Sequence, residues 1–181
     1  KQNNAYELWR YVQSRNGSKA LAAALSANAE VESYLNPGVY QGLNPSMVGY
    51  GLFQWDKHIF QPWCTERGLD YSDGNVQMGY MYDETTKIGQ WFNVNATAAN
   101  PSAWLGQWYM PWKDFLAAKN DHRYLAGVFI CSYERPKSIL YGDRAQQEKA
   151  IRDRQNLADY WYKYFNGEKP PIDPEYGWEF L

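Results

Sequence analysis

The apolar positions of the chain recur mainly at helical spacing. Between residues 4 and 13, Ala5, Leu8, Trp9 and Val12 share one helix face. Asn16-Gly17 ends that pattern, and Ser18 is suited to cap a second helix over residues 18–35, which is rich in the strong helix formers Ala and Leu. Further helices are predicted over residues 75–87, 101–108, 112–119, 124–133 and 143–165.

Two stretches break this helical pattern. Residues 38–51 are polar and rich in Gly, Asn and Pro, which predicts a loop or short hairpin, and residues 49–55 (GYGLFQW) predict a tight turn that enters a new element. After Gly167 the sequence carries three prolines and no helical period. We therefore predict a mainly α, α+β domain over residues 1–166, with a small loop or hairpin region beside the second helix. Residues 167–181 are predicted to be a Pro-rich tail or a linker towards a further domain.

The charge balance narrows the classes of function. Lys and Arg number 18 against 20 Asp and Glu, so the net charge is −2 and gives no electrostatic basis for binding nucleic acid or an anionic membrane. No apolar run approaches the roughly 18 residues of a membrane span. The chain begins at Lys1 without a methionine, from which we expect a piece of a longer protein.

The aromatic content is high, with 9 Trp and 16 Tyr. Such residues build an aromatic core, but their flat, amphipathic rings also stack on sugars in a binding cleft, and both uses fit this composition. The two cysteines, Cys64 and Cys131, set no disulfide framework, and Cys131 lies in an apolar run that predicts a buried thiol.

Two glutamates near the end of the second predicted helix differ in position. A helix advances about 100° per residue, which places Glu32 within the apolar stripe of Leu21 and Leu25 and places Glu30 on the opposite, solvated face. A carboxyl on an apolar face has its pKa raised by desolvation, as a general acid at neutral pH requires. The alternative is that Glu32 turns to solvent or pairs with a nearby arginine.

An ordered set of motifs resembles the phage-tail lysozyme family, the peptidoglycan-cleaving domains of podophage tail-knob proteins and of some endolysins and conjugation hydrolases. The set comprises Glu32-Ser33, Asn36-Pro37-Gly38, residues 49–55, Glu84, and residues 90–91, 112–116, 125–136 and 158–163. The resemblance covers residues 4–165 and implies a lysozyme-like fold with the catalytic acid at Glu32. It also implies bacterial peptidoglycan as the substrate and other phage-tail domains or subunits as partners. The expected location is in the virion, or released to act on the cell wall.

The partner of that acid stays open in the sequence. Inversion needs a carboxylate base that activates water, retention needs a nearby carboxylate nucleophile, and a lytic transglycosylase needs neither. Asp56 follows Gln54-Trp55 at the expected mouth of a cleft, and Glu84 occupies a matching place in the family. Asp83 is a weaker candidate, and the site could also lack a second carboxylate.

Four residues are candidates for binding the glycan, each with a structural alternative. Gln54 would hold an N-acetyl group or a water, or else brace its loop. Trp55 and Tyr50 would form a sugar platform, or else pack in the core. Tyr133 would approach the catalytic glutamate, or else pack at the end of its helix. Glu134 is expected to form a structural ion pair with its neighbour Arg135.

The leading hypothesis is a muramidase-type glycosidase, with a lytic transglycosylase and a non-catalytic cell-wall-binding module as the alternatives. No cofactor is expected. His58 and Cys64 lack the context of a thiol protease, and His58 and His122 without a Cys/His cluster predict no metal site. Phosphate-binding loops of the G-x-G-x-x-G or Walker type are absent from the sequence.

Overall fold

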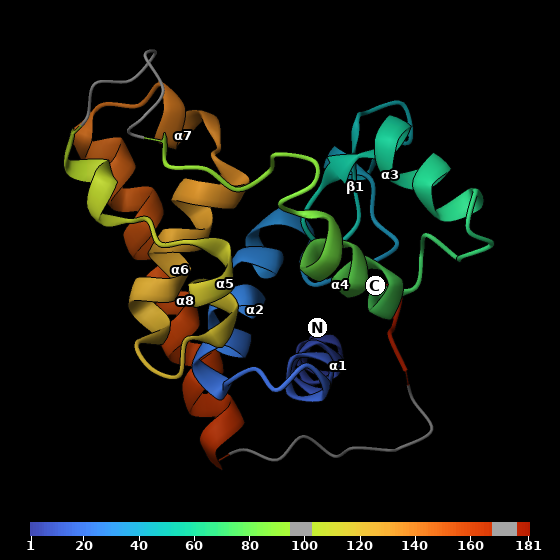
Figure 1. Cartoon of the computed structure of the whole chain (residues 1–181), viewed down its shortest axis with the longest axis horizontal. Coiled ribbons are helices and arrows are strands. Elements are labelled where there is room, and N and C mark those ends of the chain that lie inside the picture. Colours follow the sequence, from blue (N-terminus) through green and yellow to red (C-terminus); the bar gives the residue numbers. More distant parts are fainter. Residues whose placement is uncertain (95–102, 168–176) are drawn as a thin grey trace.

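The computed structural model describes residues 1–94, 103–167 and 177–181, and it confirms a mainly α fold with a small hairpin (Figure 1). The elements in chain order are α1 (Gln2–Ser14), α2 (Lys19–Ser33), η1 (Gln41–Leu43), β1 (Gly49–Tyr50), β2 (Trp55–Asp56), α3 (Lys57–Thr65), α4 (Gly74–Glu84), η3 (Ala103–Gln107), α5 (Trp112–Ala117), α6 (His122–Phe129), η4 (Ile130–Glu134), α7 (Lys137–Leu140) and α8 (Arg144–Gly167).

The elements form two lobes. The helical lobe consists of α2 and of α5 to α8 with η4, and the hairpin lobe consists of β1, β2, α3 and α4; α1 contacts both α2 and α4 (Figure 1). Helix α2 is the centre of the helical lobe, because residues 20–29 are all buried and α6 and α8 pack against it. Its many alanines let these neighbours approach closely, and a helix that is apolar on all sides belongs in a core.

A buried side-chain amide joins three helices of the helical lobe. The Asn28 side chain of α2 donates to the Ala126 carbonyl of α6 at 3.3 Å and accepts from Arg154 Nε of α8 at 3.2 Å. Because a buried amide is stable only when hydrogen-bonded, these contacts fix how the three helices are placed relative to one another. They also position the guanidinium of Arg154 beside the last turn of α2.

The hairpin lobe depends on Gln77 of α4. Its Oε1 accepts from Leu52 N at 2.8 Å, and its Nε2 donates to the carbonyls of Pro37 at 2.7 Å and Tyr71 at 2.8 Å. Gly51 has a φ of 80°, and a Cβ there would lie 2.6 Å from Gln77 Oε1, so the turn requires glycine. One side chain therefore holds three separate loop segments together.

Local signals explain most element boundaries. Ser18 accepts from Leu21 N at 3.0 Å, which confirms the predicted cap of α2. Helix α2 ends at Ser33, followed by Tyr34 and Leu35 with positive φ. The prediction over residues 124–133 is right to Phe129, after which the chain continues as the π-helical turn η4. Residues 101 and 102 of another predicted helix lie outside the described residues, and residues 103–107 form a 3₁₀ helix.

The segment 177–181 packs against the domain. Asn4 Nδ2 donates to the Glu179 carbonyl at 2.7 Å, and Asn4 Oδ1 accepts from Glu179 N at 2.7 Å. Trp178 Nε1 donates to Asn75 Oδ1 at 3.1 Å, and Asn36 Nδ2 donates to the Leu181 carbonyl at 2.8 Å. The division into a domain over residues 1–166 and a tail stays a prediction. Of the helices described, none has the length and apolar character needed to cross a bilayer.

Candidate active site

Glu32 lies in the last turn of α2, where the helix reaches the loop of the hairpin lobe. The break after Ser33 keeps this glutamate at the helix end, and Ser33 Oγ is 3.0 Å from the Leu52 carbonyl of that loop. The predicted position of Glu32 on the apolar side of α2 is therefore matched by its place at the junction of the two lobes.

Two features of the surroundings have opposite effects on the pKa of Glu32. Its side chain is 22% exposed, and its Oε1 accepts from Arg154 Nη2 at 2.8 Å. Burial raises the pKa of the Glu32 carboxyl, and the guanidinium of Arg154 counteracts that rise without cancelling it. Both sequence interpretations thus hold: Glu32 is desolvated and it pairs with an arginine.

Glu32 opens onto a pocket of about 310 Å³ between the lobes. Its lining comes from α2, η4 and the loops around β1, namely Glu32, Gln41, Gly42, Val48, Gly49, Phe53, Gln54 and Glu134. A second pocket of about 210 Å³ is lined by Phe53, Gln54, Trp55, Asp56, Ile59, Tyr80, Ile88, Gln90 and Glu134. The two pockets adjoin, because Phe53, Gln54 and Glu134 line both.

Glu134 is the feature of this site that the sequence interpretation missed. It is the last residue of η4. Among the ion pairs formed by the described residues, the expected one between Glu134 and Arg135 does not occur. Arg135 instead donates to the carbonyls of Gln90 and Ser132. A π-helical turn shifts the register of the side chains that follow it, and such turns are frequent at functional sites. Here the turn carries Glu134 to the pocket.

One oxygen of the Glu134 carboxyl is buried and lacks a partner. Its Oε1 is inaccessible to solvent and has no hydrogen-bond donor among the described residues. Burial raises the pKa of Glu134 well above its usual range, and the negative charge of Glu32 raises it further against the opposing charges of Arg154 and Arg135. The signal that could have identified it is the same as for Glu32: a glutamate at the end of an apolar helical run.

Gln54 faces the pockets and also braces its loop. Its φ is 52°, a left-handed conformation, and its Nε2 donates to the Gly51 carbonyl at 2.8 Å. Its Oε1 is buried without a donor among the described residues. The bracing bond therefore fixes the amide with its acceptor oxygen left without a donor.

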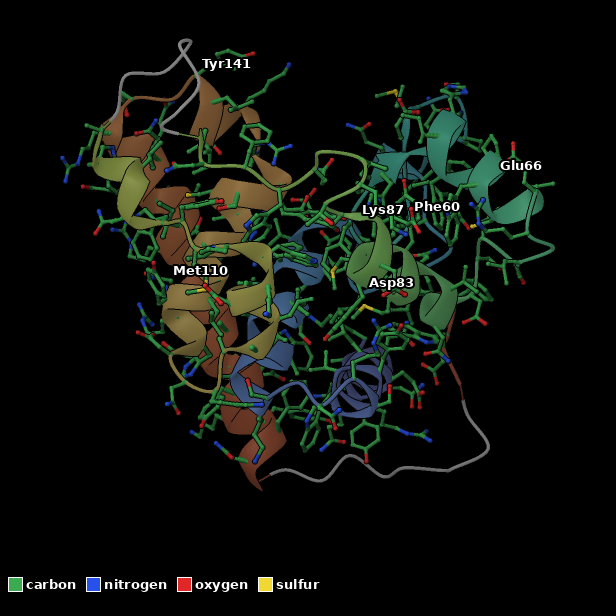
Figure 2. The ribbon with its side chains drawn as sticks, in the orientation of Figure 1. Phe60, Glu66, Asp83, Lys87, Met110 and Tyr141 are labelled. Atoms are coloured by element: carbon green, nitrogen blue, oxygen red, sulfur yellow. The ribbon has the colours of Figure 1, made fainter. Side chains whose placement is uncertain are left out.

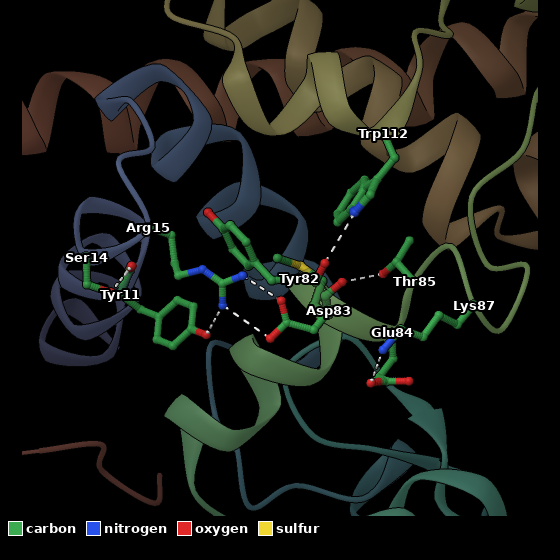
Figure 3. A network of polar contacts seen from close by, with 10 residues as sticks. Tyr11, Ser14, Arg15, Tyr82, Asp83, Glu84, Thr85, Lys87 and Trp112 are labelled. Atoms are coloured by element: carbon green, nitrogen blue, oxygen red, sulfur yellow. Dashed lines mark hydrogen bonds and ion pairs between the residues drawn. The ribbon is translucent and has the colours of Figure 1, made fainter.

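The other candidate carboxylates have structural contacts. Asp56 is exposed, accepts from His58 N at 2.9 Å as the cap of α3, and lines only the second pocket. Figure 3 shows Asp83 paired with Arg15 at 2.5 Å and Glu84 paired with Lys87 at 3.0 Å. Neither Asp83 nor Glu84 lines either of these two pockets. The structure thus does not bring Glu84 together with Glu32.

The three predicted sugar-binding aromatics are packed in the core. Tyr50, Trp55 and Tyr133 are 2%, 6% and 1% exposed, so none presents a flat face to solvent. Trp55 Nε1 donates to Tyr133 Oη at 2.5 Å, which links the two lobes beneath the pockets. Tyr50 packs its ring 4.7 Å from that of Tyr40. These contacts favour the packing alternative for all three, although Trp55 contributes to the second pocket.

The prediction of a solvated Glu30 is wrong. Its side chain is 13% exposed, accepts from Lys1 Nζ at 2.6 Å and accepts from Trp161 Nε1 at 2.8 Å. The reason is that the aromatic end of α8 and the start of the chain cover the face of α2 that periodicity assigned to solvent. Helix α2 is enclosed on both faces, but only Glu32 reaches the pocket.

The described part of the chain gives little support for a metal site or a thiol nucleophile. There, no group of three or more His, Cys, Asp or Glu side chains is disposed to hold a metal ion. Both cysteines are buried and reduced, and burial raises the pKa of the Cys64 thiol to about 11, which disfavours the nucleophilic thiolate.

The fold and this site define the class of protein. A glutamate with a raised pKa ends a central buried helix and opens onto a pocket closed by a small hairpin region, within a mainly α, lysozyme-like fold. The family model for phage tail lysozymes matches residues 3–165, and the chain belongs to that family. Membership supports a lysozyme-like role in cell-wall hydrolysis.

One curated relative gives the chain a wider context. It is similar to morphogenesis protein 1 of Bacillus phage B103, with 26% identity over 168 residues. The aligned part is 91% of this chain and 40% of the relative, so the chain spans less than half the length of that protein.

Proposed function

We propose that this domain is a muramidase-type glycoside hydrolase that cleaves the glycan backbone of bacterial peptidoglycan, with Glu32 as the general acid. The observation that carries the proposal is the placement of Glu32: it is largely buried, its pKa is raised, and it opens onto the pocket between the lobes. Membership in the phage tail lysozyme family supports the choice of substrate.

The chemistry requires a proton for the oxygen that leaves the anomeric carbon. A glutamate in water is ionised at neutral pH, whereas a desolvated one retains its proton closer to neutrality and can donate it. Arg154 bonds one oxygen of Glu32, which fixes the orientation of the carboxyl in the pocket. No cofactor enters this scheme.

The biological setting is part of the proposal. The relative's name, morphogenesis protein of a phage, and the family's link to phage tails favour a module of a tail or lysin that meets other domains or subunits of the particle. The domain would be carried on the virion or released to reach the cell wall. Nucleic acid and membrane are not proposed as partners, since the net charge is −2.

The test is digestion of purified sacculi by the wild type and by Glu32→Gln, followed by mass spectrometry of the released fragments. We expect wild-type digestion to leave reducing ends at muramic acid, and Glu32→Gln to lose about 10²–10⁴-fold of the rate while staying folded. Glu66→Gln is the matched control, because Glu66 is 75% exposed and lies in the α3 part of the hairpin lobe (Figure 2).

Three outcomes would contradict the proposal in different ways. Full activity of Glu32→Gln would remove Glu32 from the reaction. Products with 1,6-anhydro ends would assign the domain to the lytic transglycosylases. Binding of sacculi by the wild type without any release of fragments would make it a non-catalytic wall-binding module.

A further inference from the structure

Two buried acceptor atoms without donors belong to residues that line the same two pockets. Glu134 Oε1 and Gln54 Oε1 are both inaccessible to solvent, and neither has a hydrogen-bond donor among the described residues. Buried polar atoms in folded proteins are nearly always paired, so two unpaired acceptors at one site indicate a missing donor. Both residues line both pockets, and Glu32 lines one of these with them.

A single donor that served both acceptors would need at least two hydrogens and would have to be small. A water molecule meets both conditions, because it can donate one hydrogen to an amide oxygen and the other to a carboxylate. Since both oxygens are inaccessible in this structure, the two side chains must turn slightly to admit the water from the pocket. The loop of the hairpin lobe fixes Gln54 through the bond from its Nε2 to the Gly51 carbonyl. The amide therefore cannot turn its donor side to the pocket without losing that bond.

We propose that Glu134 is the second catalytic carboxyl of this site, and that it and Gln54 accept the hydrogen bonds of the water that attacks the anomeric carbon. The inference rests on the proposed glycosidase function and deepens it. It assigns the base that the sequence left open among Asp56, Asp83, Glu84 and no carboxylate at all.

The step balances within the pair of glutamates. Glu32 gives its proton to the bridging oxygen, and the bond from that oxygen to the anomeric carbon breaks with its electron pair staying on the oxygen. The water oxygen forms the new bond to the anomeric carbon and gives one proton to the Glu134 carboxylate. Glu32 ends ionised and Glu134 ends protonated, and exchange with solvent restores the first state.

The charges around the pair suit a single shared proton. Glu32 forms an ion pair with Arg154 of α8. The negative charge of Glu32 raises the pKa of the Glu134 carboxyl, and the positive charges of Arg154 and Arg135 lower it. Two adjoining buried carboxyls disfavour the state with two negative charges, while Arg154 stabilises the state with one. The ion pair with Arg154 favours the charge on Glu32, and the lack of a donor at Glu134 Oε1 favours the proton on Glu134. The reactive form, with the proton on Glu32 and the charge on Glu134, is therefore the less populated of the two singly protonated forms, and the two carboxyls titrate as a pair.

The experiment compares Glu134→Gln with Glu32→Gln on sacculi, with and without sodium azide, and Glu66→Gln serves as the control. We expect Glu134→Gln to lose about 10²–10⁴-fold of the hydrolytic rate with an unchanged circular dichroism spectrum. Azide should then restore a large part of the rate and yield glycosyl azide products, because azide attacks without giving up a proton. Glu32→Gln should gain nothing from azide, since it lacks the acid.

The outcomes separate this inference from the proposed function. Activity of Glu134→Gln within twofold of wild type, or a loss that azide does not relieve in a folded variant, would overturn the role of Glu134 while leaving Glu32 in place. An azide-rescued loss in Asp56→Asn instead would move the base to Asp56. Formation of 1,6-anhydro products by the wild type would exclude an attacking water. If Glu32→Gln is fully active, the proposed acid fails, whatever Glu134→Gln does.

Discussion

The helical lobe and the hairpin lobe are each stabilised by a different kind of interaction. In the helical lobe, α2, α6 and α8 bury continuous apolar surface, with Asn28 as the polar link among them. In the hairpin lobe, the two-residue strands contribute little, and Gln77 joins the loops through three bonds to backbone atoms. Stability is thus spread over many contacts in the first lobe and concentrated on few in the second.

The candidate site draws on both lobes. Glu32 and Glu134 come from the helical lobe, whereas Gln54 and Gly49 come from the hairpin lobe. Damage to the hairpin lobe should therefore displace one wall of the pocket. Damage of equal energy in the helical lobe should lower stability and leave the folded molecules active.

The largest expected effect is that of Gln77→Leu. The substitution leaves Leu52 N and the carbonyls of Pro37 and Tyr71 without their partner, and each unsatisfied buried group costs about 1–3 kcal/mol. We expect the free energy of unfolding to fall by about 4 kcal/mol and the lytic activity to be lost even where the protein stays folded. Urea denaturation and sacculus clearing at low temperature measure the two effects.

Leu25→Ala is the matched change in the helical lobe. Leu25 is fully buried in α2, and removal of a core leucine costs about 2–5 kcal/mol through lost contacts and the cavity left behind. The specific activity of the folded protein should stay close to that of wild type. Equal loss of activity in both variants would show that the two lobes do not differ in the way described.

Arg154→Met should have the next largest effect. It removes the donor to Glu32 and to Asn28 Oδ1, and loss of one partner of a buried ion pair costs about 3–5 kcal/mol. Without the guanidinium, the pKa of Glu32 should rise further, which moves the alkaline limb of the pH–rate profile upward. Activity measured from pH 5 to 9 tests this shift; an alkaline limb at the wild-type position would exclude Arg154 as the opposing charge.

A smaller effect is expected for stability as a function of pH. Because the folded-state pKa of Glu134 lies above the usual 4.5, its protonation stabilises the fold fully below that value, and this contribution is lost as the pH rises through the raised pKa. Glu134→Gln should therefore match the stability of wild type near pH 4 and exceed it near pH 7.5. Thermal unfolding at both pH values decides the matter, and a gap independent of pH would contradict it.

The smallest effect is that of Glu30→Gln. Glutamine keeps an acceptor for Trp161 Nε1 but loses the charge that pairs with Lys1, whose side chain is 42% exposed. We expect a loss of about 0.5–1 kcal/mol in stability and a normal rate of wall lysis. A loss of activity comparable to that of Glu32→Gln would show that the two glutamates are not separated by the faces of α2.

The helices were the most predictable part of the molecule, because their signals are local. The periodic apolar positions and Ser18 identify α2 and place Glu32 at its end, and the family motifs lead to the same residue. Helices α3 and α7 were not predicted, because α3 contains an internal proline, Pro62, and α7 is only four residues long.

The polar contacts of the site could not be predicted, because they join distant segments. Arg154 is 122 residues from Glu32 in the chain, and nothing local links them. Glu134 ends an apolar run in the sequence, as Glu32 does, but no sequence pattern shows that a π-helical turn directs its side chain to the pocket and away from Arg135. Glu30 shows another limit of sequence interpretation. Periodicity divides a helix into an apolar and a polar face, but it does not reveal that α8 covers the polar face of α2.

The bond from Trp55 to Tyr133 has a consequence for how the domain unfolds. It is a buried contact between a strand of one lobe and a turn of the other, and Trp55 also lines the second pocket. Unfolding of the hairpin lobe alone would break this buried bond, so we expect the two lobes to unfold together. We expect calorimetry to record a single cooperative peak, with the van't Hoff and calorimetric enthalpies equal, and activity to disappear along that same curve.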